Sequence, residues 1–385
     1  MGLVGPGFVA GYHLDAVRRL GDVDVVAVAG SSQESADRKA AELRVSRAYG
    51  HYRDLIADPD VDVVHNATPN YLHLPVCLMA LRAGKHVISD KPLAISADEG
   101  RQLRDAALES GRANVVLFNY RGNPLVQQAR CMVKAGGIGA VHFVHGCYFQ
   151  DWMVDAGIYS WRSDPVRSGA SSTMNDIGTH WCDLAQHIAG ANIEAVLADM
   201  STVVPVRYTD SDSHETFVHD KRPRSELRQV KGEDLASVLL RFSSGAHGSF
   251  SAGQVLPGHK NDLQIEISGR SGSLRWLQEQ PNELWVGRYG EPNSIFTKEP
   301  DQLVEAAQRY ARMPAGHQAG WSDAFYNSIW DAYEWIRAGA DPEARLPATA
   351  TFDDGYRICC VIEAMVRSQA AGGVWQKVEY IPPAR

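Results

Sequence analysis

The stretch Met1-Gly-Leu-Val-Gly5-Pro-Gly7-Phe-Val-Ala10 decides the fold of this chain. Its first residues form a short apolar strand, and the residues after the turn open a helix. Gly5 permits a tight turn, Gly7 lets the backbone approach a pyrophosphate, and the helix amino terminus attracts its negative charge. The motif predicts a dinucleotide site, although such turns also occur for packing alone. Only Met1 to Val4 precede the turn, and a start upstream of Met1 would explain so short a strand.

Short β-branched runs alternate with helical stretches through the rest of the first third. The expected strands cover residues 23–29, 61–67, 85–89 and 114–119, and the expected helices cover 35–43, 73–83 and 97–110. Such alternation with short loops is typical of a parallel sheet covered by helices on both faces. We therefore expect a doubly wound Rossmann domain over residues 1–119.

The pattern changes after about residue 120. Helices are expected at 124–135, 177–190, 321–338 and 354–369, an extended run at 140–149, and hairpins at 235–242 with 246–254 and at 263–268 with 273–277. The charged segment 205–234 lacks periodicity and is expected to be a long loop. Residues 120–385 are thus predicted to be an α+β domain with a large, open, mostly antiparallel sheet.

Composition excludes several classes of protein. The 385 residues carry 38 Lys and Arg against 46 Asp and Glu, a net charge of -8 that argues against binding nucleic acid. No segment reaches the ~20 apolar residues of a bilayer span, and the amino terminus lacks signal-peptide features. The six cysteines contain no CxxC pair, as expected of a reducing compartment. We therefore expect a cytoplasmic protein with no membrane or nucleic-acid partner.

The end of the second strand should distinguish NAD from NADP. An acidic residue there binds the ribose diol, whereas a nearby arginine favours a 2′-phosphate. The sequence has Gly30-Ser31-Ser32 at this point, with Glu34 and Arg38 further on. Since no basic residue follows the strand directly, NAD(H) is slightly favoured over NADP(H).

Several motifs together carry a family resemblance. They are residues 7–13 (GFVAGYH), 67–73 (ATPNYLH), 89–93 (SDKPL) and 176–180 (DIGTH). The chain resembles the Gfo/Idh/MocA oxidoreductases, the group of glucose–fructose oxidoreductase and inositol dehydrogenase, over nearly its whole length. Residues 148–152 (YFQDW), 160–162 (SWR) and 352–356 (FDDGY) are similar to the levoglucosan-dehydrogenase and glycoside-3-oxidising branch.

The resemblance implies which residues bind cofactor and substrate. The family's Glu-Lys-Pro motif is Asp90-Lys91-Pro92 here, one methylene shorter at the acid, and His65 and Asn66 replace more usual apolar residues. The implied cofactor-binding residues are Gly5, Gly7, Phe8, Val9, Ser31, Ser32, Arg38, Thr68, Pro69, Asn70, His73, Asp90, Lys91, Asn119, Trp161 and Arg162. The implied catalytic residues are Lys91, Asp176 and His180, and substrate contacts would add Arg121, Gln150, Asp151 and Trp152.

These residue types suit hydride transfer. Oxidising a secondary alcohol needs a base for the hydroxyl proton while hydride leaves the same carbon for the nicotinamide. His180 has a suitable unperturbed pKa, and Lys91 beside a positive nicotinamide ring is the competing base. Taken singly, Lys91 could be a surface lysine, Asp176 a helix cap and His180 a core histidine.

The sequence contains one pattern that resembles a set of metal ligands. Asp176, His180, Asp183 and His187 recur at helical spacing, but four ligands from one helix rarely converge on a single ion. We therefore expect no metal.

The sequence thus predicts an NAD(P)-dependent oxidoreductase acting on a ring secondary hydroxyl of a sugar, anhydrosugar or glycoside. The resemblance also covers NAD-dependent glycosidases that use transient oxidation, and non-catalytic dinucleotide-binding sensors. An open sheet that one helix layer cannot cover predicts a homo-oligomer, a dimer or a tetramer.

Overall fold

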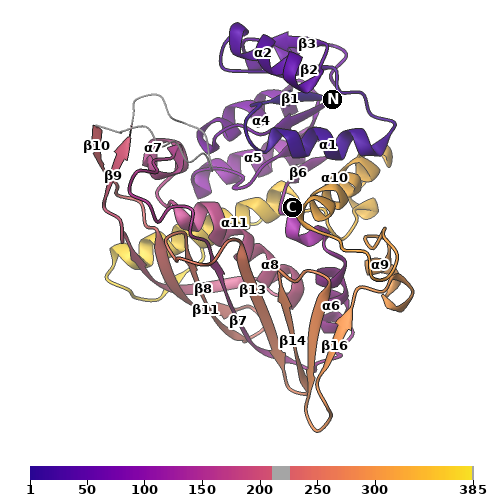
Figure 1. Ribbon diagram of the computed structural model, residues 1–385, viewed down its shortest axis with the longest axis vertical. Coiled ribbons are helices and arrows are strands. Elements are labelled where there is room, and N and C mark those ends of the chain that lie inside the picture. The colour runs from indigo at the N-terminus through magenta and orange to yellow at the C-terminus, as the bar shows by residue number, and fades with distance from the viewer. Residues whose placement is uncertain (210–225, 384–385) are drawn as a thin grey trace. The chain divides into compact units, whose positions relative to one another are not determined.

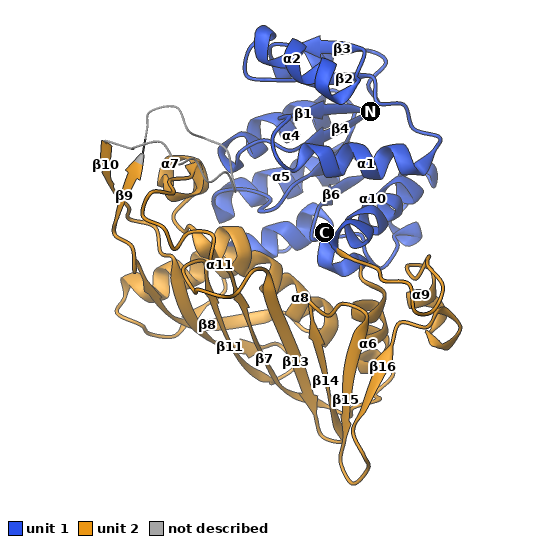
Figure 2. Cartoon of the chain, in the orientation of Figure 1, with its two compact units in different colours: residues 1–122, 321–359, 381–385 blue, residues 123–320, 360–380 orange. Residues whose placement is uncertain are grey.

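The computed structural model describes residues 1–209 and 226–383 and forms two compact units (Figure 1). Unit 1 contains residues 1–122, 321–359 and the chain from Ile381, and unit 2 contains 123–320 and 360–380 (Figure 2). Unit 1 therefore includes later segments that the expected second domain would contain. A compact unit is not the same as a family domain, so the division into 1–119 and 120–385 stays a prediction.

Unit 1 is built on a parallel sheet with strand order β3-β2-β1-β4-β5-β6. This order confirms the predicted doubly wound fold, because it steps outward from β1 in both directions. The carboxyl ends of β1, β4 and β5 lie side by side, so the loops after them are neighbours. The strands are β1 (Gly2–Val4), β2 (Ala27–Ala29), β3 (Arg47–Tyr49), β4 (Val63–Asn66), β5 (His86–Ser89) and β6 (Asn114–Val116).

Helices pack on both faces of this sheet. Successive strand residues point to opposite faces: a side chain at Gly2 would meet Leu55 of α3, whereas Leu3 belongs to a core shared with α1 and α10. On the other side of the layer, α4 packs against α3 and α5. The helices are α1 (Ala10–Leu20), α2 (Gln33–Leu43), α3 (Tyr52–Ala57), α4 (His73–Arg82), α5 (Ala97–Ser110) and α10 (Trp321–Arg337).

Unit 2 contains a large sheet with strand order β16-β15-β14-β13-β7-β12-β11-β8-β17. Neighbouring strands are antiparallel except β12 and β7, which are parallel, and both expected hairpins are present as β11–β12 and β13–β14. The strands are β7 (Val141–Phe149), β8 (Ile193–Ser201), β11 (Leu235–Phe242), β12 (His247–Gly253), β13 (Asp262–Gly269), β14 (Gly272–Leu277), β15 (Glu283–Arg288), β16 (Ser294–Thr297) and β17 (Gln376–Lys377).

The helices α6 and α8 cover one face of this sheet. Trp181 of α8 stacks on Phe250 of β12 at 4.3 Å and donates from its indole to the carbonyl of Gln264 at 2.9 Å. The helices are α6 (Pro124–Lys134), α7 (Pro165–Ser168), α8 (Thr179–Ala189), α9 (Glu305–Gln308) and α11 (Phe352–Ala370), the last divided between the two units.

Some sequence expectations were wrong in detail. Residues 23–26 do not join β2, and β6 ends at Val116, before a 3-10 turn at Asn119–Gly122. The expected loop 205–234 contains β9 (Val206–Thr209) and β10 (Glu226–Gln229), which pair antiparallel, while its residues 210–225 lie outside the described residues. Every described side chain of β10 is exposed, so this strand has no alternation of burial for a periodicity argument to detect.

None of the helices in the described part of the chain combines the length and the apolar character that crossing a bilayer would require. All six cysteines lie in that part and are free thiols.

Candidate functional site

The turn after β1 has the geometry that a dinucleotide requires. Gly5 has φ +85°, and a Cβ there would lie 2.8 Å from the backbone of Ala67 and Thr68. A Cβ at Gly7 would meet no atom within 4 Å, so the turn is open on the side where a phosphate would approach. The helix α1 begins after Val9 without a side-chain cap or an acidic residue in its first turn. Its positive end is therefore suited to an anion, and the residues present fit the implied cofactor.

Phe8 follows Gly7 and is about half exposed, with its ring 5.6 Å from that of Tyr12. The residues predicted to select NAD over NADP lie at the next strand. Ser31 is exposed, and Ser32 caps α2 by accepting a hydrogen bond from the amide of Ser35 at 3.2 Å. Arg38 is exposed on α2. The structure thus places neither an acid nor an arginine directly after β2.

Asn66 organises the turn after β4. Its side-chain oxygen accepts from the hydroxyl of Thr68 at 2.7 Å, and its amide nitrogen donates to the hydroxyl of Ser89 at 3.3 Å. Pro69 and Asn70 follow at the start of a 3-10 turn, where Asn70 is buried. The unusual asparagine therefore links the ends of β4 and β5, where ligands of open α/β sheets bind.

His73 joins the same two loops. Its Nδ1 lies 2.7 Å from the carbonyl oxygen of Pro92 and its Nε2 lies 2.9 Å from that of Thr68. Burial lowers the pKa of His73, and the two carbonyl contacts act in the opposite direction. This predicted cofactor residue thus fixes the loops that would line the cofactor rather than standing at their surface.

Asp90 and Lys91 follow β5 directly. The amide of Asp90 donates to the carbonyl of Asn66 at 2.9 Å, and one carboxylate oxygen of Asp90 lies 3.2 Å from Nε2 of His13. Lys91 is half-buried, and its peptide bond to Pro92 is cis. The structure therefore places both residues at the carboxyl end of the sheet in unit 1, as the sequence predicted.

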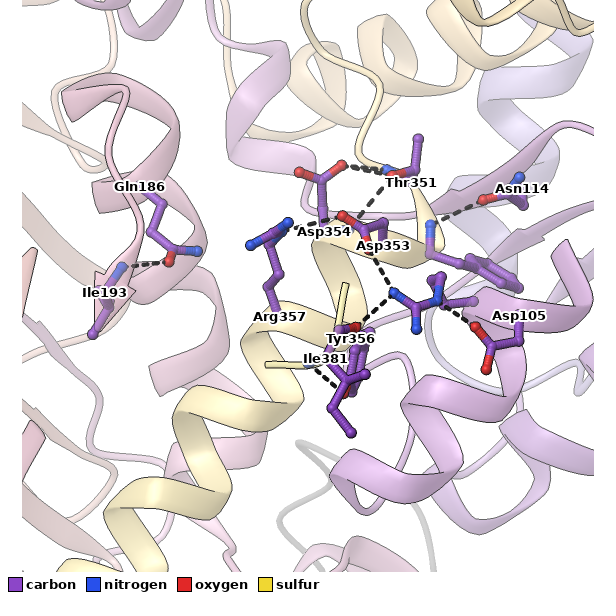
Figure 3. A network of polar contacts seen from close by, with 12 residues as sticks. Asp105, Asn114, Gln186, Ile193, Thr351, Asp353, Asp354, Tyr356, Arg357 and Ile381 are labelled. Atoms are coloured by element: carbon purple, nitrogen blue, oxygen red, sulfur yellow. Dashed lines mark hydrogen bonds and ion pairs between the residues drawn. The ribbon is translucent and has the colours of Figure 1, made fainter. Parts of the chain in front are cut away.

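Arg121 was expected to contact substrate; it is buried and forms an ion pair with a partly exposed aspartate. Its guanidinium is 3.3 Å from Asp354, whose other oxygen accepts from the amide and hydroxyl of Thr351 at 2.7 and 2.9 Å. Figure 3 shows Thr351, Asp353 and Asp354 together at the start of α11. Burial raises the pKa of Asp354, but the charge of Arg121 and the bonds from Thr351 outweigh it and hold that pKa below its usual value. Asn119 is buried two residues before Arg121.

In unit 2, Asp176 lies between a cation and an amide. Nε of Arg162 is 3.1 Å from one carboxylate oxygen, and the side-chain amide of Gln254 donates to the other at 2.8 Å. The guanidinium of Arg162 also stacks over the ring of Trp161 at 4.6 Å. Asp176 belongs to a π-helical turn (Met174–Gly178), a distortion that is frequent at functional sites. Asp176 is therefore not an ordinary helix cap, because an arginine and a glutamine from elsewhere hold its carboxylate.

Gln254 extends this cluster to Gln150 and Trp152. Its amide nitrogen lies 3.2 Å from the side-chain oxygen of Gln150, which also accepts from the indole of Trp152 at 3.0 Å. The amide of Gln150 donates to Asn261 at 3.1 Å, and the hydroxyl of Tyr148 donates to the same oxygen at 2.6 Å. The result is a continuous set of amide and carboxylate groups, which can both donate to and accept from hydroxyls.

His180 is the first-turn histidine of α8. It is buried, and its ring centroid lies 6.4 Å from that of Tyr148.

The start of this helical segment is fixed by Glu233, whose carboxylate accepts from the amides of Ser172 and Met174 at 3.1 and 2.8 Å. Burial raises the pKa of Glu233. Glu233 thus holds the turn that carries Asp176.

Asp151 and Trp152 are oriented differently from each other. Asp151 forms an ion pair at 2.5 Å with the exposed Lys260, which lowers the pKa of Asp151. Trp152 is buried in a small apolar cluster with Met153 and Val255.

Within residues 1–209 and 226–383, no three His, Cys, Asp or Glu side chains gather in a way that could hold a metal ion. His187, one of the rejected ligand candidates, instead lies 3.1 Å from the side-chain amide of Gln127.

Sequence reasoning missed Gln254, Asn261, Glu233 and His13 as site residues. The only sequence signal that could have marked Gln254 as a site residue is its position as the polar residue at the end of an expected strand. Glu233 fell in the expected loop, and nothing in the sequence marks its partners. In unit 1 the structure groups the turn at Gly5, the loops of Thr68 and His73, and Asp90. In unit 2 it groups Arg162 and Asp176 with Gln150 and Trp152, the cluster that Gln254 completes.

Comparison with known proteins shows which family the chain belongs to. Residues 1–118 match the family described as an oxidoreductase family with an NAD-binding Rossmann fold, and residues 126–275 match the GFO/IDH/MocA C-terminal domain. The chain is similar to the levoglucosan dehydrogenase of Pseudarthrobacter phenanthrenivorans, at 30% identity over 361 residues that cover 92% of this chain and 89% of that protein.

Two solved structures extend the likeness to nearly the whole fold. Levoglucosan dehydrogenase in complex with NADH and levoglucosan has a TM-score of 0.85 at 28% identity and covers 98% of this chain and 99% of that one. An inositol dehydrogenase homolog complexed with NAD⁺ from Azotobacter vinelandii has a TM-score of 0.85 at 26% identity, with coverage of 98% and 96%. The chain belongs to the Gfo/Idh/MocA family of oxidoreductases.

Proposed function

We propose that this oxidoreductase transfers hydride between a ring secondary hydroxyl of a sugar or anhydrosugar and a nicotinamide cofactor. The observation that carries the proposal is the turn after β1, where Gly5 is required by the backbone and Gly7 leaves open space beside an uncapped helix end. The amide-rich cluster around Asp176 supports a substrate with several hydroxyls. The relatives named for levoglucosan support an anhydrosugar within that class.

The catalytic roles follow from the chemistry of each group. His180 accepts the proton of the reacting hydroxyl, and Asp176 orients the imidazole or binds a neighbouring hydroxyl. Lys91 donates a hydrogen bond to the reacting oxygen and stabilises its developing negative charge. A bound nicotinamide would supply the acceptor for the hydride that leaves the same carbon.

The remaining polar residues would position the substrate. Arg162 and Gln254 hold the two oxygens of the Asp176 carboxylate and fix it in one orientation. Gln150 and Asn261 offer further donors and acceptors for ring hydroxyls. Asp151, Trp152 and Arg121 remain predicted substrate contacts. In this structure each of the three side chains contacts another protein side chain, which a bound substrate would either replace or leave in place.

The cofactor is proposed to be NAD(H) in preference to NADP(H). A 2′-phosphate is recognised by a basic group directly after the second strand, and Ser31 and Ser32 stand there instead. Arg38 is the nearest candidate on the following helix. Arg38→Ala should therefore leave NADH affinity within about twofold of wild type. The assignment would be reversed if the wild type bound NADPH more tightly than NADH and Arg38→Ala lost most of its NADPH affinity.

A homo-oligomer formed through the open face of the unit 2 sheet is also proposed. The strand pairings place Leu239, His145, Glu266 and Ile295 in one row across that face, and Leu239 and Ile295 are about half exposed. Exposed apolar residues on a sheet face favour self-association. Light scattering at micromolar concentration should give a dimer or a tetramer, and a monomer would reject the proposal. The cytoplasmic location expected from the sequence stays a prediction.

The direct experiment is a screen for reduced nicotinamide by its absorbance. Purified protein is mixed with NAD⁺ or NADP⁺ and with levoglucosan, simple monosaccharides, glycosides or inositol. The proposal expects net reduction with at least one ring alcohol and faster reduction of NAD⁺. Bond cleavage of a glycoside without net reduction would favour the glycosidase alternative, and cofactor binding without any turnover would favour a sensor.

A further inference from the structure

A row of buried polar side chains runs through unit 1 and ends at Asp90. The hydroxyl of Tyr333 lies 3.0 Å from Nε2 of His65, and Nδ1 of His65 lies 2.9 Å from Nδ1 of His13. Nε2 of His13 then lies 3.2 Å from a carboxylate oxygen of Asp90. Both histidines are fully buried and Tyr333 is nearly so, whereas the Asp90 side chain is 18% exposed. The row therefore runs from a buried side chain of α10, through side chains of β4 and α1, to the end of β5.

When both histidine rings are neutral, the hydrogen-bond requirements of these groups fix the direction of the whole row. An ionised carboxylate can only accept, so His13 must carry its proton on Nε2. In a neutral ring the other nitrogen is then an acceptor, so His65 must donate from Nδ1. The Nε2 of His65 is left as an acceptor, and the hydroxyl of Tyr333 donates to it. With both rings neutral, this is the single arrangement in which all three contacts are hydrogen bonds, and each is donated along the row toward Asp90.

Burial supports this assignment at the inner end. It lowers the pKa of His65 well below the usual value, so His65 stays neutral. Burial also raises the pKa of Tyr333, which therefore keeps its proton and remains a donor. The ring of Phe325 packs edge-on against His13 at 5.1 Å and limits its rotation.

We infer that His13, His65 and Tyr333 are positioning residues that hold the Asp90 carboxylate in one orientation beside Lys91. The backbone of Asp90 is already fixed by its bond to Asn66, so the remaining freedom is the rotation of its side chain. A hydrogen bond to a carboxylate removes that freedom and keeps the acceptor oxygens in place. The consequence for the cofactor rests on the proposed function, whereas the arrangement itself rests on the three contacts.

The arrangement is tested first in cofactor-free protein. Nitrogen-15 NMR of the histidine rings should show His13 protonated on Nε2 and His65 protonated on Nδ1, the less common neutral tautomer. Tyr333→Phe removes only the terminal hydroxyl and should shift the Asp90 side-chain carbon resonance through the two rings. Tyr326→Phe, the same change on the same helix, should leave that resonance in place. The opposite tautomers, or an Asp90 resonance indifferent to Tyr333→Phe, would overturn the inference.

The consequence for the cofactor is tested by titration with NADH, without turnover. Tyr333→Phe should weaken NADH binding about 3- to 10-fold, the range expected for one lost hydrogen bond, and Tyr326→Phe should not. In an Asp90→Ala background the same Tyr333→Phe change should have no further effect, because the row then ends at no carboxylate. An equal loss in both backgrounds would show a merely structural role and overturn the inference. Absence of NADH binding in the wild type would instead contradict the proposed function, and the tautomers would still decide the positioning.

Discussion

The side-chain amide of Gln254 donates to the carboxylate of Asp176 at 2.8 Å, from the end of one strand to a π-helical turn. Arg162 contacts the other oxygen of the same carboxylate at 3.1 Å. Both oxygens are thus held by donors, and the free rotation of Asp176 is removed. A carboxylate fixed in this way can orient an imidazole or a substrate hydroxyl without moving during the reaction.

Removing the Gln254 donor should slow the reaction without unfolding the protein. Gln254→Ala is expected to lower kcat about 10- to 100-fold, the effect of losing one hydrogen bond to a charged group. Gln264→Ala on β13, whose side chain bonds Asp262 instead, serves as the matched control and should stay within about twofold. Steady-state kinetics distinguish the two variants, and equal rates in both would remove Gln254 from the site.

The two glycines of the first turn should respond differently to valine. Gly7→Val adds a side chain into open space, so the fold should survive while NADH affinity collapses. Gly5→Val imposes a disfavoured φ and a backbone clash at 2.8 Å, so it should lower the melting temperature as well. Thermal melts and NADH titration on the same samples make the comparison. Normal affinity in folded Gly7→Val would contradict the cofactor site.

The identity of the base can be read from pH profiles. If His180 accepts the hydroxyl proton, His180→Ala should lower kcat about 10²- to 10⁴-fold with cofactor binding intact. Lys91→Ala should then be slower but keep a profile governed by a group that titrates like imidazole. If Lys91→Ala abolishes the pH dependence and His180→Ala keeps it, the two roles are exchanged.

Stability should fall as the pH drops below about 6.5, the usual pKa of histidine. The pKa of His65 is lowered in the folded state, so below that pH the unfolded chain binds a proton that the folded chain does not. Each such group reduces the free energy of unfolding by up to about 1.4 kcal/mol per pH unit. His73 and His86 act in the same direction, whereas the lowered carboxylates act only at lower pH.

His65→Gln should therefore flatten this dependence between pH 6.5 and about 5, the window in which histidines rather than carboxylates titrate. Denaturant unfolding at several pH values gives the slope for wild type and variant. Identical slopes would mean that His65 is not a buried neutral ring.

Much of the fold was predictable because its signals are local. The turn Gly5 to Ala10 and the β-branched runs gave the parallel sheet, and Ser-Ser-Gly at 243–245 marked the β11–β12 hairpin. Short elements such as β3 and β10 were missed, because three or four residues with little burial contrast carry no period. The departures at His65 and Asn66 could be seen but not explained.

The site was harder to predict because its contacts join distant segments. Gln254 meets Asp176 only because the end of β12 lies against the π-helical turn before α8. The role of His65 can be seen only in the folded chain, where it contacts Tyr333 and His13, and His13 in turn contacts Asp90. Such pairs depend on register and packing, which a single sequence does not state.

The central claim is that hydride moves from a ring carbon of the substrate to the nicotinamide. The most direct measurement uses levoglucosan, or the best substrate of the screen, deuterated at its ring carbons, together with NAD⁺. Mass spectrometry of the recovered cofactor should show reduced nicotinamide carrying one deuterium for each molecule of substrate oxidised. Reduced cofactor without deuterium, or substrate consumed with no reduced cofactor at all, would contradict the account.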